Sequence, residues 1–145
     1  MKEASPQQAY ELMQSDPEIV YLDVRSVPEF EAGHPQGAIN VPLLHFVPGV
    51  GMSPNADFAA VVEANLPKDA KIVVGCKSGG RSANACQVMS QLGYTDVTNM
   101  SGGFSGAADM FGRVVEPGWA MLNLPVSTAV ADGADYEALA AKAKK

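Results

Sequence analysis

Residues 71–82 of the chain read KIVVGCKSGGRS and change character halfway. The first five, Lys71–Gly75, are mostly β-branched and apolar, which predicts a short buried strand. After Cys76 the apolar residues recur at helical spacing and predict a helix that Gly93 ends. The residues of that stripe are Ser82, Ala85, Cys86, Met89 and Leu92. A strand, a glycine-rich loop and a helix in this order are typical of α/β domains.

Similar signals occur on both sides of this stretch. Ser5, with Pro6 and Gln8, is a capping signal for a first helix that would bury Ala9, Leu12 and Met13. The other predicted elements, in chain order, are a strand over 19–22 ending at Asp23, a helix over 27–31, a strand over 38–41, irregular loop over 46–55, a helix over 57–66 and a strand over 96–100. This alternation predicts one α/β domain with a largely parallel sheet.

Composition excludes several classes of protein. The chain has 145 residues, 47% of them hydrophobic, and a formal net charge of -6, which disfavours nucleic acid or an anionic membrane as partner. It contains no apolar run of about 18 residues and does not start like a signal peptide. Two cysteines, Cys76 and Cys86, exclude a disulfide scaffold and a four-cysteine metal site. We therefore expect a cytoplasmic protein with reduced thiols, and neither a metal nor a cofactor.

The loop from Cys76 to Ser82 has the chemistry of an anion site. Gly79 and Gly80 let the backbone turn sharply, and the start of a helix presents unpaired N–H groups and a positive dipole end. Lys77 and Arg81 add positive charge, and Ser78 completes the loop. In such surroundings the pKa of a cysteine falls from about 8.5 to roughly 3.5–7.5. Cys76 is the candidate nucleophile; the alternative is an inert buried cysteine at a strand end.

Other candidate residues have more ordinary interpretations. Arg25 could bind an anionic donor, but an ion pair with Asp23 or Glu29 that braces the loop is favoured. His34 precedes a proline, and its ring is expected to hydrogen-bond the backbone rather than act as a base. Cys86 is expected to pack in the core rather than form a disulfide with Cys76.

Four ordered motifs resemble the rhodanese homology domain family. The loop resembles that family's Cys-x-x-Gly-x-Arg-Ser pattern. The other three motifs, LDVR followed by EF at 22–30, GHPQGAINVP at 33–42, and GGF at 102–104 with LPV at 124–126, are similar to its remaining signatures in the same order. The resemblance covers residues 5–126.

The resemblance implies a three-layer domain over residues 1–126, with a five-stranded parallel sheet flanked by helices. It implies a sulfurtransferase that accepts sulfane sulfur from thiosulfate or a persulfide on Cys76, cradled by the N–H groups of residues 77–82, and passes it to a thiophilic acceptor. Asp23 and Arg25 are supporting residues. The expected partners are small sulfur donors and acceptors, including a protein thiol. Residues 127–145 form an extension with helical spacing that either docks or frays.

Departures from the family pattern concern the acceptor side. Pro35 stands where the family usually has an aliphatic residue. The tryptophan that is common soon after the Gly102-Gly103 pair is absent, and Trp119 comes much later. Residues 105–118 form an extended segment between the GGF motif and Trp119.

Two rival functions remain open. A phosphatase or arsenate reductase of the same fold would use a loop one residue longer, whereas Cys76 to Arg81 spans six residues. The other rival is a non-catalytic interaction module, although inactive domains of this family typically lose the cysteine.

Overall fold

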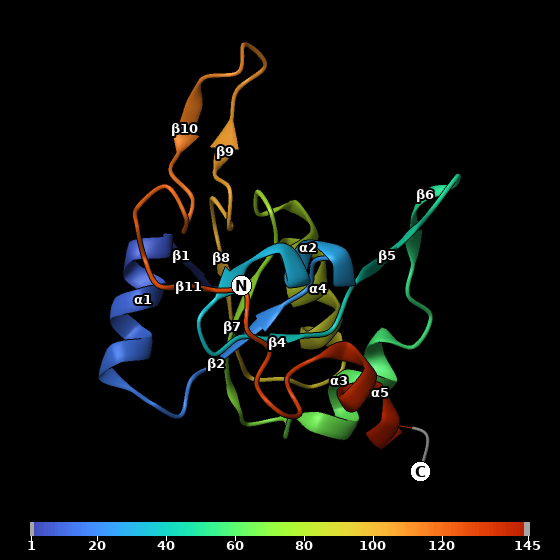
Figure 1. The fold of residues 1–145 in the computed structure, drawn as a ribbon. Helices are drawn as coiled ribbons and strands as arrows, with labels where there is room; N and C mark the ends of the chain where they lie inside the picture. Colours follow the sequence, from blue (N-terminus) through green and yellow to red (C-terminus); the bar gives the residue numbers. More distant parts are fainter. Residues whose placement is uncertain (1, 144–145) are drawn as a thin grey trace.

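A five-stranded parallel sheet forms the centre of the molecule (Figure 1). The computed structural model describes residues 2–143. The strand order is β1 (Lys2–Ala4), β8 (Asp96–Met100), β7 (Lys71–Gly75), β2 (Val20–Asp23) and β4 (Ile39–Asn40). The predicted α/β architecture is confirmed. The edge strand β1 was not predicted, because three residues before a helix cap carry no alternating pattern of their own.

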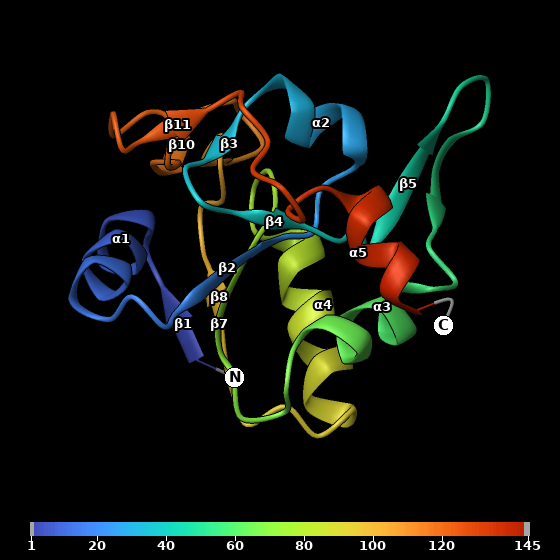
Figure 2. The ribbon, with the colours of Figure 1, turned by 60° about the horizontal axis from the view of Figure 1, so that its bottom comes forward.

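Helices cover both faces of the sheet. These are α1 (Pro6–Ser15), α2 (Val27–Ala32), α3 (Phe58–Asn65), α4 (Gly80–Gln91) and α5 (Tyr136–Ala143). Figure 2 shows α1 on one side of the central strands and α3, α4 and α5 on the other. Ser5 caps α1 through a reciprocal pair of hydrogen bonds with Gln8, as the sequence predicted.

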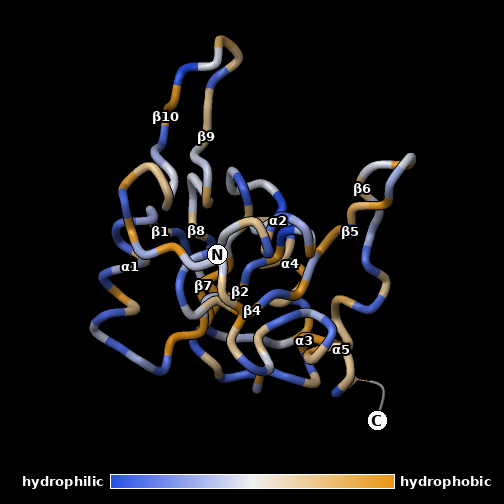
Figure 3. Tube along the Cα trace, in the orientation of Figure 1, coloured by the Kyte–Doolittle hydropathy of each residue, from blue (hydrophilic) through white to orange (hydrophobic). Residues whose placement is uncertain are grey.

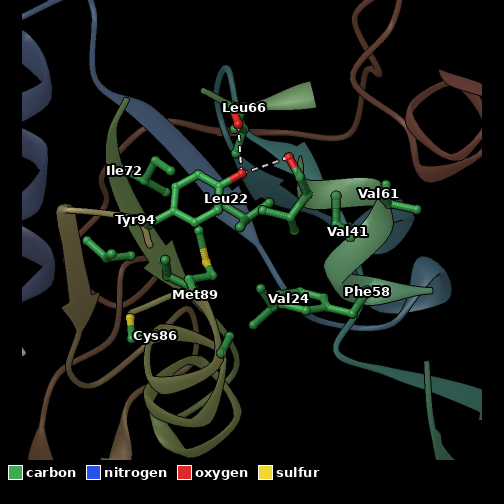
Figure 4. Packing of buried hydrophobic residues seen from close by; sticks show 14 of the residues in the cluster. Leu22, Val24, Val41, Phe58, Val61, Leu66, Ile72, Cys86, Met89 and Tyr94 are labelled. Atoms are coloured by element: carbon green, nitrogen blue, oxygen red, sulfur yellow. Dashed lines mark hydrogen bonds between the residues drawn. The ribbon is translucent and has the colours of Figure 1, made fainter. Parts of the chain in front are cut away.

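Alternate residues along the central strands supply two separate cores. Leu22, Ile72 and Val74 face α3 and α4, while Tyr21 and Val73 face α1 and Trp119. In the first core, the Tyr94 hydroxyl oxygen lies 3.1 Å from the Val62 carbonyl oxygen and 2.7 Å from that of Leu66, so its one hydrogen has two acceptors within reach (Figure 4). Apolar side chains therefore anchor β7 on both faces, which fixes the strand end that carries Cys76.

Two expectations for the amino-terminal half were wrong. Of the three residues of α1 expected to be buried, Ala9 is buried and Met13 partly buried, but Leu12 is 44% exposed. The apolar stripe of α1 is narrower than the spacing of these residues predicted. Residues 46–55 are not irregular: β5 (Leu44–Val47) and β6 (Gly51–Pro54) form an antiparallel hairpin. Its Gly and Pro residues lie at the turn and at the strand end, where they are compatible with pairing.

The segment over 105–118 is a second hairpin, with β9 (Ala107–Ala108) pairing with β10 (Val114–Glu116). The two ends of this segment lie side by side, because the backbone N–H of Trp119 donates to the Gly103 carbonyl at 2.9 Å. Trp119 itself is buried between Tyr10 and Tyr21. Both hairpins project from the body and carry exposed hydrophobic residues (Figure 3).

The carboxyl-terminal segment docks on the domain. Short strands β3 (His34–Pro35) and β11 (Val126–Ser127) pair antiparallel, and α5 then packs against α3. Leu139 is buried there, and its carbonyl accepts a hydrogen bond from Asn65 at 2.9 Å. Of the two alternatives left open for this stretch, the structure has the docked one for Tyr136–Ala143. No helix within residues 2–143 is long and apolar enough to cross a membrane.

Candidate active site

Cys76 lies directly after β7, at the carboxyl edge of the sheet, and is 2% exposed. Gly79 adopts the left-handed region, with φ 110°, and caps the amino terminus of α4. The chain therefore folds back over the cysteine, and the Gly79 N–H points at Cys76 Sγ with a distance of 3.1 Å. Of the loop N–H groups predicted to surround the sulfur, that of Gly79 lies within hydrogen-bond distance of Sγ.

The other predicted loop residues separate into covered and exposed groups. Ser82, in the first turn of α4, is fully buried, and its Oγ lies 3.4 Å from Cys76 Sγ. Lys77 and Ser78 are exposed, as is Gly80 at the start of the helix. Gly79 and Ser82 therefore lie on the buried side of Cys76 Sγ, at the positive end of the α4 dipole.

A second loop supports the first and was not assigned a site role from the sequence. The N–H groups of Phe104 and Ser105 donate to the carbonyls of Cys76 and Lys77 at 2.8 and 2.9 Å. Gly103, which lies between the end of β8 and Phe104, has φ 63°. A Cβ added there would stand 2.6 Å from the Cys76 carbonyl oxygen. The sequence identified the GGF motif only as a family signature. Its packing against the cysteine could not be predicted without the fold.

Arg81, which the sequence predicted to add positive charge at the loop, forms an ion pair with Glu29. Its two terminal nitrogens donate to the Glu29 carboxylate at 2.8 and 3.0 Å. Burial by itself raises the pKa of Glu29, but hydrogen bonds from Arg81 and Ser26 outweigh it and lower the pKa to about 2. Arg81 thereby ties the start of α4 to α2, and its charge remains near the site.

The Glu29–Arg81 pair predicts an acid-sensitive part of stability. The pKa of Glu29 is about 2 in the folded protein against an ordinary 4.5, so the pair stabilises the fold above pH 4.5. That contribution is lost as the pH falls from about 4.5 to about 2. Glu29→Gln should therefore show a smaller drop in urea midpoint between pH 6 and pH 2.5 than the wild type. Glu31→Gln, an exposed carboxylate on the same helix, should keep the wild-type drop; equal drops for all three would contradict the prediction.

Asp23 and Arg25 form a buried ion pair beside the loop, which is the favoured of the two predicted roles. Arg25 Nε and Nη2 donate to the Asp23 carboxylate, the latter at 2.8 Å. The guanidinium also donates to the Gly33 carbonyl at 2.6 Å and stacks over the Phe104 ring. With these contacts Arg25 joins three segments around the site.

Removal of one partner of this pair should strongly destabilise the protein. The two side chains are 6% and 1% exposed, so Arg25→Met would leave Asp23 as an uncompensated buried charge. We expect the free energy of unfolding in urea to fall by about 3 kcal/mol or more. Arg113→Met, which removes the cation of an exposed pair with Asp109, should be nearly neutral. Equal effects of the two substitutions would contradict this interpretation.

A pocket of about 450 Å³ adjoins the loop at Lys77. Its walls include the cations of Arg25 and Lys77, the carboxylate of Glu29, and Phe104 and Ser105. A cavity of about 480 Å³ lies at the opposite edge of the sheet, where Lys2 and Lys71 are already paired with Asp96 and Asp16. The pocket beside the cysteine is the better candidate for an anionic substrate because it adjoins the cysteine loop and includes the exposed Lys77.

The remaining candidates have structural roles. His34 lies with Nδ1 2.7 Å from the Phe30 carbonyl and Nε2 3.0 Å from the Ala129 carbonyl, so the predicted backbone bonding is confirmed. Cys86 is a free buried thiol packed near Met89 (Figure 4), and burial raises its pKa to about 12. Cys76 is also free. Within residues 2–143, no three His, Cys, Asp or Glu side chains gather as a metal site would require.

Comparisons with known proteins give one family match and several similar proteins. The family model described as Rhodanese-like domain matches residues 5–109. Thiosulfate sulfurtransferase 16, chloroplastic, of Arabidopsis thaliana is 45% identical over 85 residues, 59% of this chain and 70% of that protein. Protein HIGH ARSENIC CONTENT 1, mitochondrial, of the same plant is 39% identical over 61% of this chain, which spans about half (52%) of that protein. The crystal structure of Rv0390 from M. tuberculosis gives a TM-score of 0.74 at 27% identity, covering 89% of this chain and 98% of the other.

Proposed function

This chain belongs to the rhodanese-like domain family, and on that premise we propose that it is a sulfurtransferase that carries sulfane sulfur on Cys76. Thiosulfate, a small dianion, is the donor that we propose, because the exposed cation of Lys77 lines the pocket beside the cysteine loop. The name of one relative, a thiosulfate sulfurtransferase, points to the same donor.

The proposed reaction has two displacement steps on sulfur. The Cys76 thiolate attacks the outer sulfur of thiosulfate; a Cys–S bond forms, and the S–S bond breaks with its electron pair leaving on sulfite. The terminal sulfur of the resulting persulfide carries the negative charge. An acceptor such as cyanide then attacks that sulfur, and the electron pair of the broken S–S bond returns to Cys76 as the thiolate. Neither step requires an oxidant, a reductant or a metal.

One observation carries the proposal more than any other: the Gly79 N–H lies 3.1 Å from Cys76 Sγ at the amino terminus of α4. A helix terminus with an N–H directed at sulfur favours an anionic sulfur over a neutral one. A buried structural cysteine needs no such donor. The same observation speaks against a non-catalytic interaction module, which would have no use for a stabilised anion here.

A phosphatase or arsenate reductase is the rival activity, and one relative's name refers to arsenic. The loop from Cys76 to Arg81 contains six residues, one fewer than the tetrahedral-anion loops of that rival class. In addition, both terminal nitrogens of Arg81 donate to the Glu29 carboxylate. These features favour sulfur over phosphate or arsenate.

The proposed function predicts selective use of thiosulfate. Sulfur transfer from thiosulfate to cyanide, followed as thiocyanate, should be readily measured with the purified protein. Hydrolysis of an aryl phosphate and reduction of arsenate in the presence of thiols should be negligible at the same protein concentration. Robust turnover in either of the latter assays, with none in the first, would overturn the proposal.

The physiological acceptor and compartment stay predictions. A small thiol or a protein thiol is the acceptor class that we propose, since either can attack the terminal sulfur of a persulfide. A cytoplasmic location remains our expectation, although the names of two relatives place them in the chloroplast and the mitochondrion.

A further inference from the structure

The Ser82 hydroxyl has more acceptors within reach than it can serve. Its Oγ lies 2.5 Å from Asn99 Oδ1, 3.1 Å from the Gly79 carbonyl oxygen and 3.4 Å from Cys76 Sγ. A hydroxyl carries one hydrogen and can donate to one of these at a time. The shortest contact gives that hydrogen to Asn99, so in this arrangement Ser82 does not donate to the sulfur.

Asn99 is a buried polar residue without a role in the reaction proposed above. It lies on β8, opposite Val74 of β7, and is 3% exposed, on the face of the sheet that α4 covers. An amide differs from a carboxylate in carrying both an acceptor and two donors. Rotation of the side-chain amide would therefore present Nδ2 to Ser82 Oγ in place of Oδ1.

We propose that Asn99 is a positioning residue that directs the Ser82 hydroxyl hydrogen toward or away from the Cys76 sulfur. The observed arrangement, in which Ser82 donates to Asn99 Oδ1, is the one that we assign to the neutral thiol. When the thiol loses its proton, the amide turns, Nδ2 donates to Ser82 Oγ, and the freed hydrogen bonds the thiolate. Asn99 acts through Ser82 and touches no reacting atom. This inference rests on the proposed function in so far as Cys76 must be the reactive thiol.

The test is the pH dependence of Cys76 alkylation by iodoacetamide, with Cys86→Ala as the background so that one thiol remains. Ser82→Ala should move the midpoint of the alkylation profile upward by about one pH unit, because the thiolate loses a hydrogen-bond donor. Asn99→Leu keeps the side-chain size and removes the amide, and should move the midpoint upward by about half a unit. The Ser82→Ala/Asn99→Leu double variant should match Ser82→Ala alone, because Asn99 then has no hydroxyl to direct.

An Asn99→Leu midpoint identical to that of the background would overturn the inference, and so would an Asn99→Leu shift that persists at full size without the Ser82 hydroxyl. Asn99→Ala is measured in the same way if the leucine variant does not fold. Asn65→Ala is the matched control, because it removes another partly buried amide that bonds Val61 and Leu139, and should lower stability without moving the midpoint. If Cys76 is alkylated as described but thiosulfate gives no sulfur transfer, the proposed function fails while this inference stands.

Discussion

Cys76→Ser should abolish sulfur transfer from thiosulfate, with a loss on the order of 10³-fold or more, while the protein stays folded. Serine is nearly isosteric with cysteine and can still accept the Gly79 N–H, whose distance to Sγ is 3.1 Å. Its hydroxyl, however, neither ionises near neutral pH nor forms a persulfide. We therefore expect the thermal midpoint to change little and the thiosulfate-to-cyanide rate to fall to background.

Cys86→Ala is the matched control for this substitution. Cys86 is buried in the core on α4, and its pKa is raised to about 12, so it is a poor nucleophile at neutral pH. Its replacement should lower stability slightly and leave the rate close to that of the wild type. Sulfur transfer that survives Cys76→Ser, or that disappears in Cys86→Ala with the fold intact, would show that the nucleophile has been assigned to the wrong cysteine.

Gly103→Ala should damage both the fold and the site. At φ 63° an alanine is strained, and its Cβ would stand 2.6 Å from the carbonyl oxygen of Cys76 and from the carbonyl group of Lys77. The backbone that carries the cysteine must then move, because a carbonyl cannot rotate away as a flexible side chain can. We expect the free energy of unfolding to fall by about 2 kcal/mol or more and sulfur transfer to fall at least about tenfold.

Two other glycines separate the causes of this effect. Gly112 has φ 80°, and a Cβ added there would have no atom within 4 Å, so Gly112→Ala measures the left-handed strain alone. Gly80 has open space and no positive φ, so Gly80→Ala tests whether any added methyl group in the loop impairs activity. Both should retain nearly full sulfur transfer. A Gly103→Ala variant as stable and active as Gly112→Ala would contradict the role given to this contact.

The central strands and the cysteine loop could be predicted because each carries a local signal. Lys71–Gly75 contains an apolar, β-branched run of strand length, Asp96–Met100 follows the glycine that ends a helix, and the glycines after Cys76 mark a strand-to-helix turn. The strand β1 and the hairpin over 44–54 could not be read in the same way. β1 is a strand because it pairs with β8, and β5 and β6 are strands because they pair with each other. Neither segment carries a strand pattern of its own.

The direction of individual side chains was the harder part of the site. Arg81 lies five residues after Cys76, and nothing local shows that its guanidinium is engaged by Glu29, 52 residues earlier. The same holds for Asn99, which reaches Ser82 only because β8 lies beside β7 in the sheet. Its one local signal is a polar residue at a position of β8 that alternation places in the core.

The most direct test of Cys76 as the sulfur carrier is the mass of the intact protein after treatment with thiosulfate and removal of small molecules. One added sulfur atom per chain, mapped by peptide analysis to Cys76 and released by cyanide with recovery of the original mass, is the predicted result. The loop cannot have the function proposed for it if the mass does not change, or if the added sulfur is found on Cys86.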